Sequence, residues 1–350
     1  MESTSIFSIV SKAKVLLFPH LQDAKARLYP HVPDYLSYRR GKYKNIFLLG
    51  SRRSGSTHLS RILSCDRGVR LIDQPFDLFK PHTQVGRIKA AHLPSMPNSQ
   101  FITLSDGQEV LVRKYISRIL EGRLKPLGGI ERWGFPFLAN RTVLKICNAS
   151  PLIDWFNAQF NVSIVYLLRH PISQALSVIW NKWGITARAY INNESFVRSY
   201  LDRDKSKLAH EILSKGTYFE KAILNWCLEN IVPLKHCGSE VLAITYEDLV
   251  LDPVATIKLL SNRLGLKNIR GMLRMIRVPS QPAFSEEKTK DAIREGKREF
   301  LIGRWREQVS VKQLDYARRI LETFGIFEYR IDSPLPAERA NSAWIPIANL

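Results

Sequence analysis

The sequence predicts an α/β fold of three layers, in which a parallel sheet is flanked by helices on both faces. Short apolar segments with the character of buried strands alternate with segments of helical spacing along the chain. The first strand leads through a glycine-bearing loop directly into a helix. The chain of 350 residues, 45% of them hydrophobic, suits one large domain with a sizeable core.

The strand predictions rest on continuous apolar runs. Residues 45–49 carry Ile, Phe and two Leu in a row, and residues 163–168 carry Ile, Val, Tyr and two Leu. Such runs are typical of strands that are buried on both faces, as in a parallel sheet. Shorter runs of the same kind at residues 142–146 and 241–245 complete the predicted sheet.

Helical spacing is found between and after these strands. A helix follows the first strand, and another begins at Pro171 and runs toward Trp180, because proline suits the first helical position. Gly265 stands where a later helix is expected to end. We expect further helices at residues 151–160, 219–231, 254–264 and 311–324.

The ends of the chain differ from the middle in composition. Residues 1–40 are basic with scattered prolines, and they form a lead-in that precedes the main domain at residues 41–330. Residues 331–350 are rich in Pro, Ala and Ser, which predicts a loosely ordered tail.

The charge balance predicts an anionic partner. Lys and Arg number 52 against 32 Asp and Glu, a net charge of +20. A phosphorylated cofactor, an acidic polymer, an acidic membrane surface and nucleic acid all fit that charge. No zinc-finger, RRM or OB signature accompanies it, so a nucleic-acid partner is disfavoured.

The cysteines and the hydropathy indicate the compartment. None of the four cysteines is spaced C-x-x-C, which excludes the common zinc and redox motifs and favours reduced thiols in a cytoplasmic protein. No apolar stretch is long enough to span a bilayer. Residues 1–40 leave open a peripheral position at a membrane surface.

A phosphate-binding loop follows the first predicted strand. Residues 50–57 match the template G-x-x-x-x-G-K-[ST] except that Ser56 replaces the lysine. Gly50 and Gly55 permit a tight turn whose N–H groups face inward, and the following helix adds its positive N-terminal end. Charge and further donors come from Arg52, Arg53, Ser54, Ser56 and Thr57.

The missing lysine argues against hydrolysis of a nucleoside triphosphate, because NTPases use it to reach the β- and γ-phosphates. The strand at residues 241–245 is followed by Tyr246-Glu247-Asp248, a poor match to a magnesium-binding strand end. The loop therefore predicts a cradle for a 5′-phosphate. A nucleotide kinase or NTPase remains the alternative, and a non-catalytic nucleotide-binding protein is a further one.

Residues 47–57 resemble the 5′-phosphosulfate-binding loop of sulfotransferases that use 3′-phosphoadenosine 5′-phosphosulfate (PAPS) and release its desulfated product PAP. In that family a basic residue, here Arg53, contacts the bridging oxygen and stabilises charge on the leaving phosphate. The resemblance implies a P-loop-like fold, PAPS as the donor and no metal requirement. Arg53 would act electrostatically, because a guanidinium does not readily give up a proton.

Two later segments resemble other parts of the same family's donor site. Residues 165–171 form a strand ending in Arg169, and Ser177 follows eight positions later, as in the pair that grips the 3′-phosphate of PAPS. A basic stretch before a G-x-W-[KR] motif resembles the loop that closes over that phosphate, with a solvated helix face as the alternative. Its candidate residues are Arg294, Lys297 and Arg298.

The layout of residues 54–57 and 71–76 is similar to that of carbohydrate-type and bacterial sulfotransferases. This similarity implies a carbohydrate or glycoconjugate as acceptor, either free or associated with a membrane. Those enzymes often carry a Glu before Pro75 as catalytic base, whereas this chain carries Gln74, which cannot act as one.

Three other residues are therefore candidates for the base, in the order Asp73, His92 and Asp77. Small-molecule sulfotransferases use a His two residues after a Lys, and here Lys145 stands at the lysine position while Cys147 replaces the His. Lys145 is expected to contact the donor.

Overall fold

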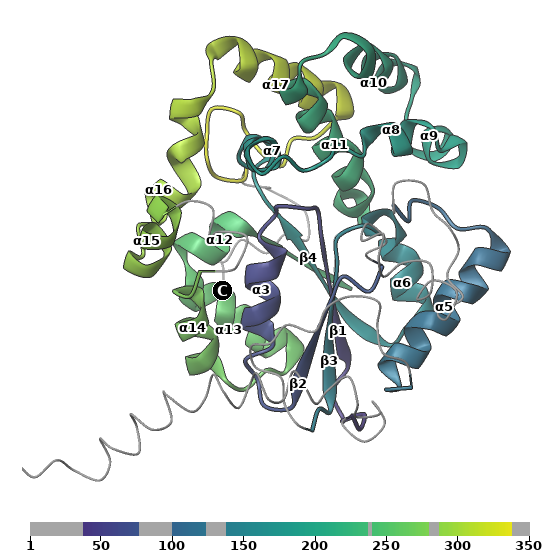
Figure 1. Ribbon diagram of the computed structural model, residues 1–350, viewed down its shortest axis with the longest axis vertical. Helices are drawn as coiled ribbons and strands as arrows, with labels where there is room; N and C mark the ends of the chain where they lie inside the picture. Colours follow the sequence, from purple (N-terminus) through teal and green to yellow (C-terminus); the bar gives the residue numbers. More distant parts are fainter. Residues whose placement is uncertain (1–37, 77–99, 124–137, 237–239, 280–286, 338–350) are drawn as a thin grey trace, which may run out of the picture.

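The computed structural model describes residues 38–76, 100–123, 138–236, 240–279 and 287–337 (Figure 1). Two candidates for the catalytic base, Asp77 and His92, lie outside the described residues. So does most of the basic lead-in predicted at residues 1–40.

A five-stranded parallel sheet forms the centre of the molecule, in the order β2-β3-β1-β4-β5 (Figure 1). This confirms the predicted fold class and the four predicted strands. The strands are β1 Asn45–Gly50, β2 Val69–Asp73, β3 Arg141–Ile146, β4 Val162–Leu168 and β5 Val241–Thr245.

Strand β2 was not predicted, because Arg70 interrupts its apolar pattern. The guanidinium of Arg70 is nonetheless buried, where Nε donates to Thr142 Oγ1 at 2.9 Å and Nη2 donates to the Ile119 carbonyl at 2.7 Å. A buried cation is tolerated when its donors are satisfied. Partners distant in sequence therefore place this polar segment at the edge of the sheet.

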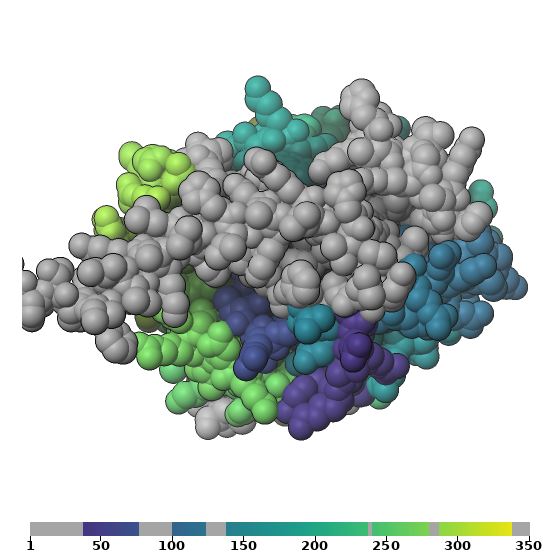
Figure 2. Space-filling view, turned by 60° about the horizontal axis from the view of Figure 1, so that its bottom comes forward, coloured from purple at the N-terminus to yellow at the C-terminus, as the bar shows by residue number. Residues whose placement is uncertain are grey.

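Helices cover both faces of the sheet. Successive side chains of β1 point to opposite faces, so the strand contributes to a core cluster on each side. Phe47 and Leu49 lie in one core cluster, together with residues of α5 Asp106–Leu120, α6 Ile153–Gln159, α7 Pro171–Trp180, α11 Tyr218–His236 and α17 Val311–Phe324. Ile46 and Leu48 lie in the other, with residues of α3 Ser56–Leu63, α12 Tyr246–Leu251, α13 Pro253–Leu264 and α14 Ile269–Ile276. Figure 2 shows α3 beside the green segment that contains α13 and α14.

The helix ends follow the sequence signals where those were strong. Helix α13 ends at Gly265, which has a φ of 65°, as predicted. Helix α11 continues beyond its predicted end, through Pro233, to His236.

Within the described ranges, no helix combines the length and apolar character needed to cross a bilayer. The remaining elements are η3 Ser150–Leu152, α8 Ala187–Ile191, α9 Glu194–Tyr200, α10 Arg203–Lys215, α15 Glu287–Glu295, α16 Arg298–Gly303 and η5 Arg304–Gln308.

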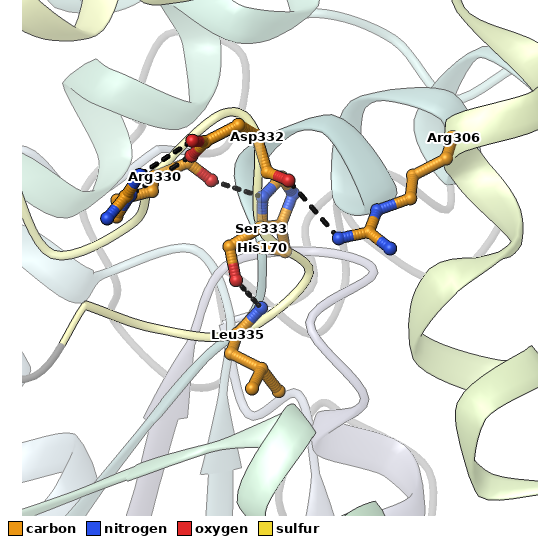
Figure 3. A network of polar contacts seen from close by, with 6 residues as sticks. All are labelled: His170, Arg306, Arg330, Asp332, Ser333 and Leu335. Carbon is orange, nitrogen blue, oxygen red and sulfur yellow. Dashed lines mark hydrogen bonds and ion pairs between the residues drawn. The ribbon is translucent and has the colours of Figure 1, made fainter.

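The segment after α17 folds back onto the start of α7 (Figure 3). The Arg330 carbonyl lies 3.3 Å from His170 Nε2, and Arg306 Nη2 donates to the Asp332 carbonyl at 3.2 Å. The His170 ring is buried and stacks on Trp305 at 4.5 Å. Burial lowers the pKa of His170 to about 3, so the imidazole is neutral at physiological pH.

A buried carboxyl group, that of Glu247, takes part in the same contact between the C-terminal segment and the start of α7. Glu247 accepts from the backbone N–H of His170 at 3.0 Å and from the Tyr329 hydroxyl at 3.0 Å. Burial raises the pKa of Glu247 to about 7, although these hydrogen bonds oppose the shift. The C-terminal segment and α12 are thereby tied to the end of β4, next to Arg169.

Candidate active site

A cleft of about 1240 Å³ opens at the carboxyl ends of the strands. Ligands of open parallel sheets bind at this edge, because the loops that follow the strands meet there. The cleft is lined by the β1–α3 loop, the ends of β2, β3 and β4, the end of α7, and residues of α12 to α16 and η5.

The β1–α3 loop requires its two glycines. A Cβ at Gly50 would lie 2.8 Å from the Leu167 carbonyl, and one at Gly55 would lie 2.7 Å from the Tyr246 ring. Gly55 also has a φ of 101°, which side chains disfavour. No described side chain caps the N-terminus of α3, where Ser56 and Thr57 line the cleft. The first N–H groups of α3 are therefore suited to an anion.

Two arginines and a serine from three elements meet beside this loop. Arg53 Nε donates to Ser177 Oγ at 3.0 Å, and Arg169 Nη1 donates to the Arg53 carbonyl at 3.0 Å. The Arg169 guanidinium lies 4.5 Å from the Tyr246 ring centre, and its backbone carbonyl accepts from Trp226 at 3.0 Å. Burial and the charge of Arg169 lower the pKa of Arg53 to about 10, so Arg53 stays cationic at physiological pH. We call Arg53, Arg169 and Ser177 the anion corner.

Lys145 supplies a further cation from β3. Its ammonium lies 2.7 Å from Asp73 Oδ1 and donates to Thr57 Oγ1 at 2.7 Å. Asp73 and Lys145 are paired in the register of β2 and β3, so strand pairing aligns them at the cleft edge. Beside them, Ser56 Oγ lies 3.2 Å from Cys147 Sγ.

The candidates for the base occupy different positions. The Asp73 side chain is 26% exposed and lines the cleft. Gln74 also lines it, but its amide oxygen accepts from the Cys147 N–H at 3.2 Å, so this side chain holds the end of β3. Among the described residues, Asp73 is thus the base candidate that reaches the cleft.

The structure separates the predicted basic residues into two groups. Arg52 and Arg298 line the cleft, and Arg298 Nη1 donates to the Leu251 carbonyl at 2.8 Å. Arg294 and Lys297 do not line the cleft and form exposed ion pairs with Asp291 and Glu295. Ser54 was expected to offer its hydroxyl to the donor, but its side chain is fully buried next to Gly50 and does not line the cleft.

Sequence reasoning missed three cleft residues. His58 lines the cleft on α3, and burial together with Arg61 lowers its pKa to about 4, so its ring is neutral. Tyr246 packs between Gly55 and Arg169, and Arg304 of η5 also lines the cleft. His58 follows the phosphate loop and Tyr246 follows β5 directly. Ligands bind at the carboxyl ends of parallel strands, so the position of His58 and Tyr246 after predicted strands is the sequence signal that indicates a place in the cleft.

The chemistry of the cleft is cationic. The anion corner, Lys145 and the N-terminus of α3 can hold a ligand with separate anionic groups, next to the carboxylate of Asp73. Over the described ranges, no cluster of three or more His, Cys, Asp or Glu side chains is arranged to hold a metal ion.

Solved structures similar to this chain include sulfotransferases. A mouse sulfotransferase complexed with PAP shares 15% identity at a TM-score of 0.38, over 81% of this chain and 84% of that one. A sulfotransferase domain from a Synechococcus olefin synthase shares 18% identity at a TM-score of 0.38, and the match covers 83% of this chain and 98% of that one. A sulfotransferase domain from the curacin biosynthetic pathway shares 18% identity at a TM-score of 0.42, and the match covers 82% of this chain and 99% of that one.

A sequence comparison with curated proteins finds no match. The family model described as the sulfotransferase family matches residues 45–269. That range contains β1 and its phosphate loop, Lys145 on β3, and the anion corner. Because the match spans most of the chain and all of these site residues, the chain belongs to the sulfotransferase family.

Proposed function

We propose that this protein transfers a sulfuryl group from PAPS to a hydroxyl or amine of an acceptor. The observation that carries the proposal is the anion corner, where Arg53 of the phosphate loop contacts Ser177 and Arg169. A cradle for one phosphate and a separate arginine–serine pair suit a nucleotide that carries anionic groups at both its 5′ and 3′ positions.

The residues of the cleft fit such a donor. The buried Nε of Arg169 has no partner within the part of the chain that the structure describes, which leaves a donor for an anion. Arg169 and Ser177 would hold the 3′-phosphate, and Arg298, which also lines the cleft, would add a further positive charge. The loop N–H groups, Arg53 and Lys145 would hold the 5′-phosphosulfate.

In the transfer, the acceptor oxygen or nitrogen forms a bond to sulfur while the bond between sulfur and the bridging oxygen breaks, leaving its electron pair on the phosphate of PAP. Asp73 takes the acceptor proton. Arg53 and Lys145 stabilise the charge that develops on the leaving phosphate, and both act without losing a proton. The ion pair between Lys145 and Asp73 orients the carboxylate in the cleft.

For the acceptor we propose a carbohydrate or glycoconjugate, supported by the layout of residues 54–57 and 71–76 and by exposed tryptophans at the cleft. We place the reaction in the cytoplasm, with peripheral attachment to a membrane as a variant of the same proposal. The described cysteines Cys65, Cys147 and Cys227 are free thiols, as expected in a reducing compartment.

Calorimetric titration with PAP in the absence of Mg²⁺ tests the donor site. We expect metal-independent binding by the wild type and a loss of about 10- to 100-fold in Arg53→Ala and Arg169→Ala, because each removes a charge-assisted hydrogen bond. Arg318→Ala is the matched control, since Arg318 pairs with Asp315 on the exposed face of α17. Binding of ATP with Mg²⁺ and not of PAP would replace this proposal with a nucleotide kinase.

A further inference from the structure

Two tryptophans stand exposed at the end of α7, beside the anion corner. Trp180 is 45% exposed and Trp183 is 43% exposed, although large aromatic side chains are mostly buried in folded proteins. Both line the cleft, and Ser177 of the anion corner lies one helical turn before Trp180. Exposed aromatic rings at the edge of a binding cleft indicate a surface for a ligand.

The end of α7, which carries Trp180, and the turn after it, which carries Trp183, are held by hydrogen bonds. Helix α7 ends with paired hydrogen bonds from Lys182 N–H to the Ile179 carbonyl and from Trp183 N–H to the Val178 carbonyl, both at 3.0 Å. Lys182 has a φ of 53°, where glycine is usual and a side chain is unfavourable. The Tyr218 hydroxyl donates to the Trp183 carbonyl at 2.9 Å. Strained and braced backbone of this kind is concentrated at functional sites.

Each tryptophan lies beside an arginine that also lines the cleft. The Arg52 guanidinium is 5.7 Å from the Trp183 ring centre, and the Arg304 guanidinium is 5.5 Å from the Trp180 ring centre. Arg52 comes from the phosphate loop and Arg304 from η5, so the two pairs are assembled from three separate elements. Both arginines are additional to those of the anion corner. The rim therefore combines aromatic surface with positive charge.

We propose that Trp180, Trp183, Arg52 and Arg304 form the acceptor subsite and that it takes a sugar bearing a carboxylate, a uronate. The apolar face of a sugar ring packs against an indole ring, and a guanidinium offers a planar pair of donors to a carboxylate. This inference rests on the proposed function, because it assumes that the donor occupies the other part of the cleft. The inference goes beyond the proposed function because it assigns a negatively charged group, a carboxylate, to the acceptor.

The test titrates the PAP-saturated protein with an unsulfated oligosaccharide of alternating glucuronate and N-acetylglucosamine, and with the same compound after reduction of its carboxylates to alcohols. We expect the uronate form to bind at least about ten-fold more tightly. Arg304→Gln should abolish this preference, whereas Trp183→Ala should weaken both forms by about ten-fold. PAP affinity should stay within about two-fold of wild type in both variants, because neither side chain belongs to the anion corner.

Tyr316→Ala is the matched control, because Tyr316 also has a cation near its ring, Lys312 at 5.7 Å on α17. It should bind both oligosaccharides as the wild type does. Equal binding of the two forms, or binding of neither by protein that does bind PAP, overturns the uronate subsite alone. Loss of PAP affinity in Arg304→Gln overturns it as well, by assigning Arg304 to the donor. Failure of the wild type to bind PAP would instead overturn the proposed function.

Discussion

The ammonium of Lys145 donates a hydrogen bond to the hydroxyl of Thr57 across 2.7 Å. Thr57 is the second residue of α3, next to Ser56, the position at which the phosphate-loop template carries its lysine. The two residues come from different elements, since Lys145 belongs to β3. The cation that the loop lacks in sequence is thus supplied at the same place by a neighbouring strand.

Lys145→Met should lower turnover by about 100-fold, because it removes a charge next to the leaving phosphate. It also leaves Asp73 and Thr57 without their shared partner. Sulfuryl transfer from radiolabelled PAPS measures the effect. Lys290→Met is the control, since Lys290 forms an ion pair of the same 2.7 Å length with Glu287 but does not line the cleft. Unchanged turnover in Lys145→Met would exclude Lys145 from the reaction.

Asp73→Asn should lower turnover by roughly 100- to 10,000-fold, the usual contribution of a general base. PAP affinity should not fall, because the substitution leaves both the anion corner and the Lys145 ammonium in place and removes only a negative charge beside Lys145. The same assay on Asp77→Asn and His92→Ala compares the other candidates. A larger loss in either of these variants, with Asp73→Asn remaining active, would move the base away from Asp73.

Gly55→Ala should destabilise the fold by about 2 kcal/mol and weaken PAP binding, since it adds strain at a positive φ and a clash with the Tyr246 ring. Gly325→Ala separates the two causes. Gly325 has a φ of 67° but no atom within 4 Å of an added Cβ, so its variant should lose only about 1 kcal/mol. Denaturant unfolding measures both, and equal losses would show that contact with Tyr246 costs nothing.

Lys182→Gly should raise the free energy of unfolding by about 0.5 kcal/mol, because relief of the left-handed conformation exceeds the entropy that glycine loses on folding. Denaturant unfolding of the variant and the wild type at equal ionic strength gives the difference. A fall in stability would show that contacts of the Lys182 side chain outweigh the backbone strain.

Glu247 should make the protein less stable as pH rises. Its pKa is about 7 in the folded state against an ordinary value of 4.5, so between these values the folded protein binds more protons than the unfolded chain. The stabilisation is complete below pH 4.5 and is lost as pH rises through 7. Relative to Glu247→Gln, the wild type should lose roughly 2 kcal/mol between pH 5 and pH 8.

The readout for Glu247 is the difference in pH slope between the two proteins, followed by denaturant unfolding. The absolute stability of Glu247→Gln also reflects altered hydrogen bonds to His170 and Tyr329. Parallel pH profiles would contradict a buried carboxyl that protonates near neutrality. His170 contributes the opposite slope in both proteins, since its lowered pKa favours the folded state as pH rises from about 3 toward 6.5.

Local sequence patterns determined most of the fold and the phosphate loop. The apolar runs at β1, β3, β4 and β5 predict buried strands by themselves, because strand burial leaves a continuous hydrophobic signature. The glycines of the β1–α3 loop, and Arg169 with Ser177 at a spacing of eight residues, are likewise readable in one dimension. These are features whose physical cause lies within a few residues of one another.

Tertiary structure alone decided how the site is completed. Strand β2 depends on distant partners for Arg70, and Lys145 meets Thr57 and Asp73 because parallel pairing brings the carboxyl ends of β2, β3 and β1 to one edge. Trp180 and Trp183 are exposed at the cleft because they lie at the last residue of α7 and in the turn that follows it, beside the phosphate loop and η5. Such contacts have no signature in the local sequence, since they join elements that only the folded sheet brings together.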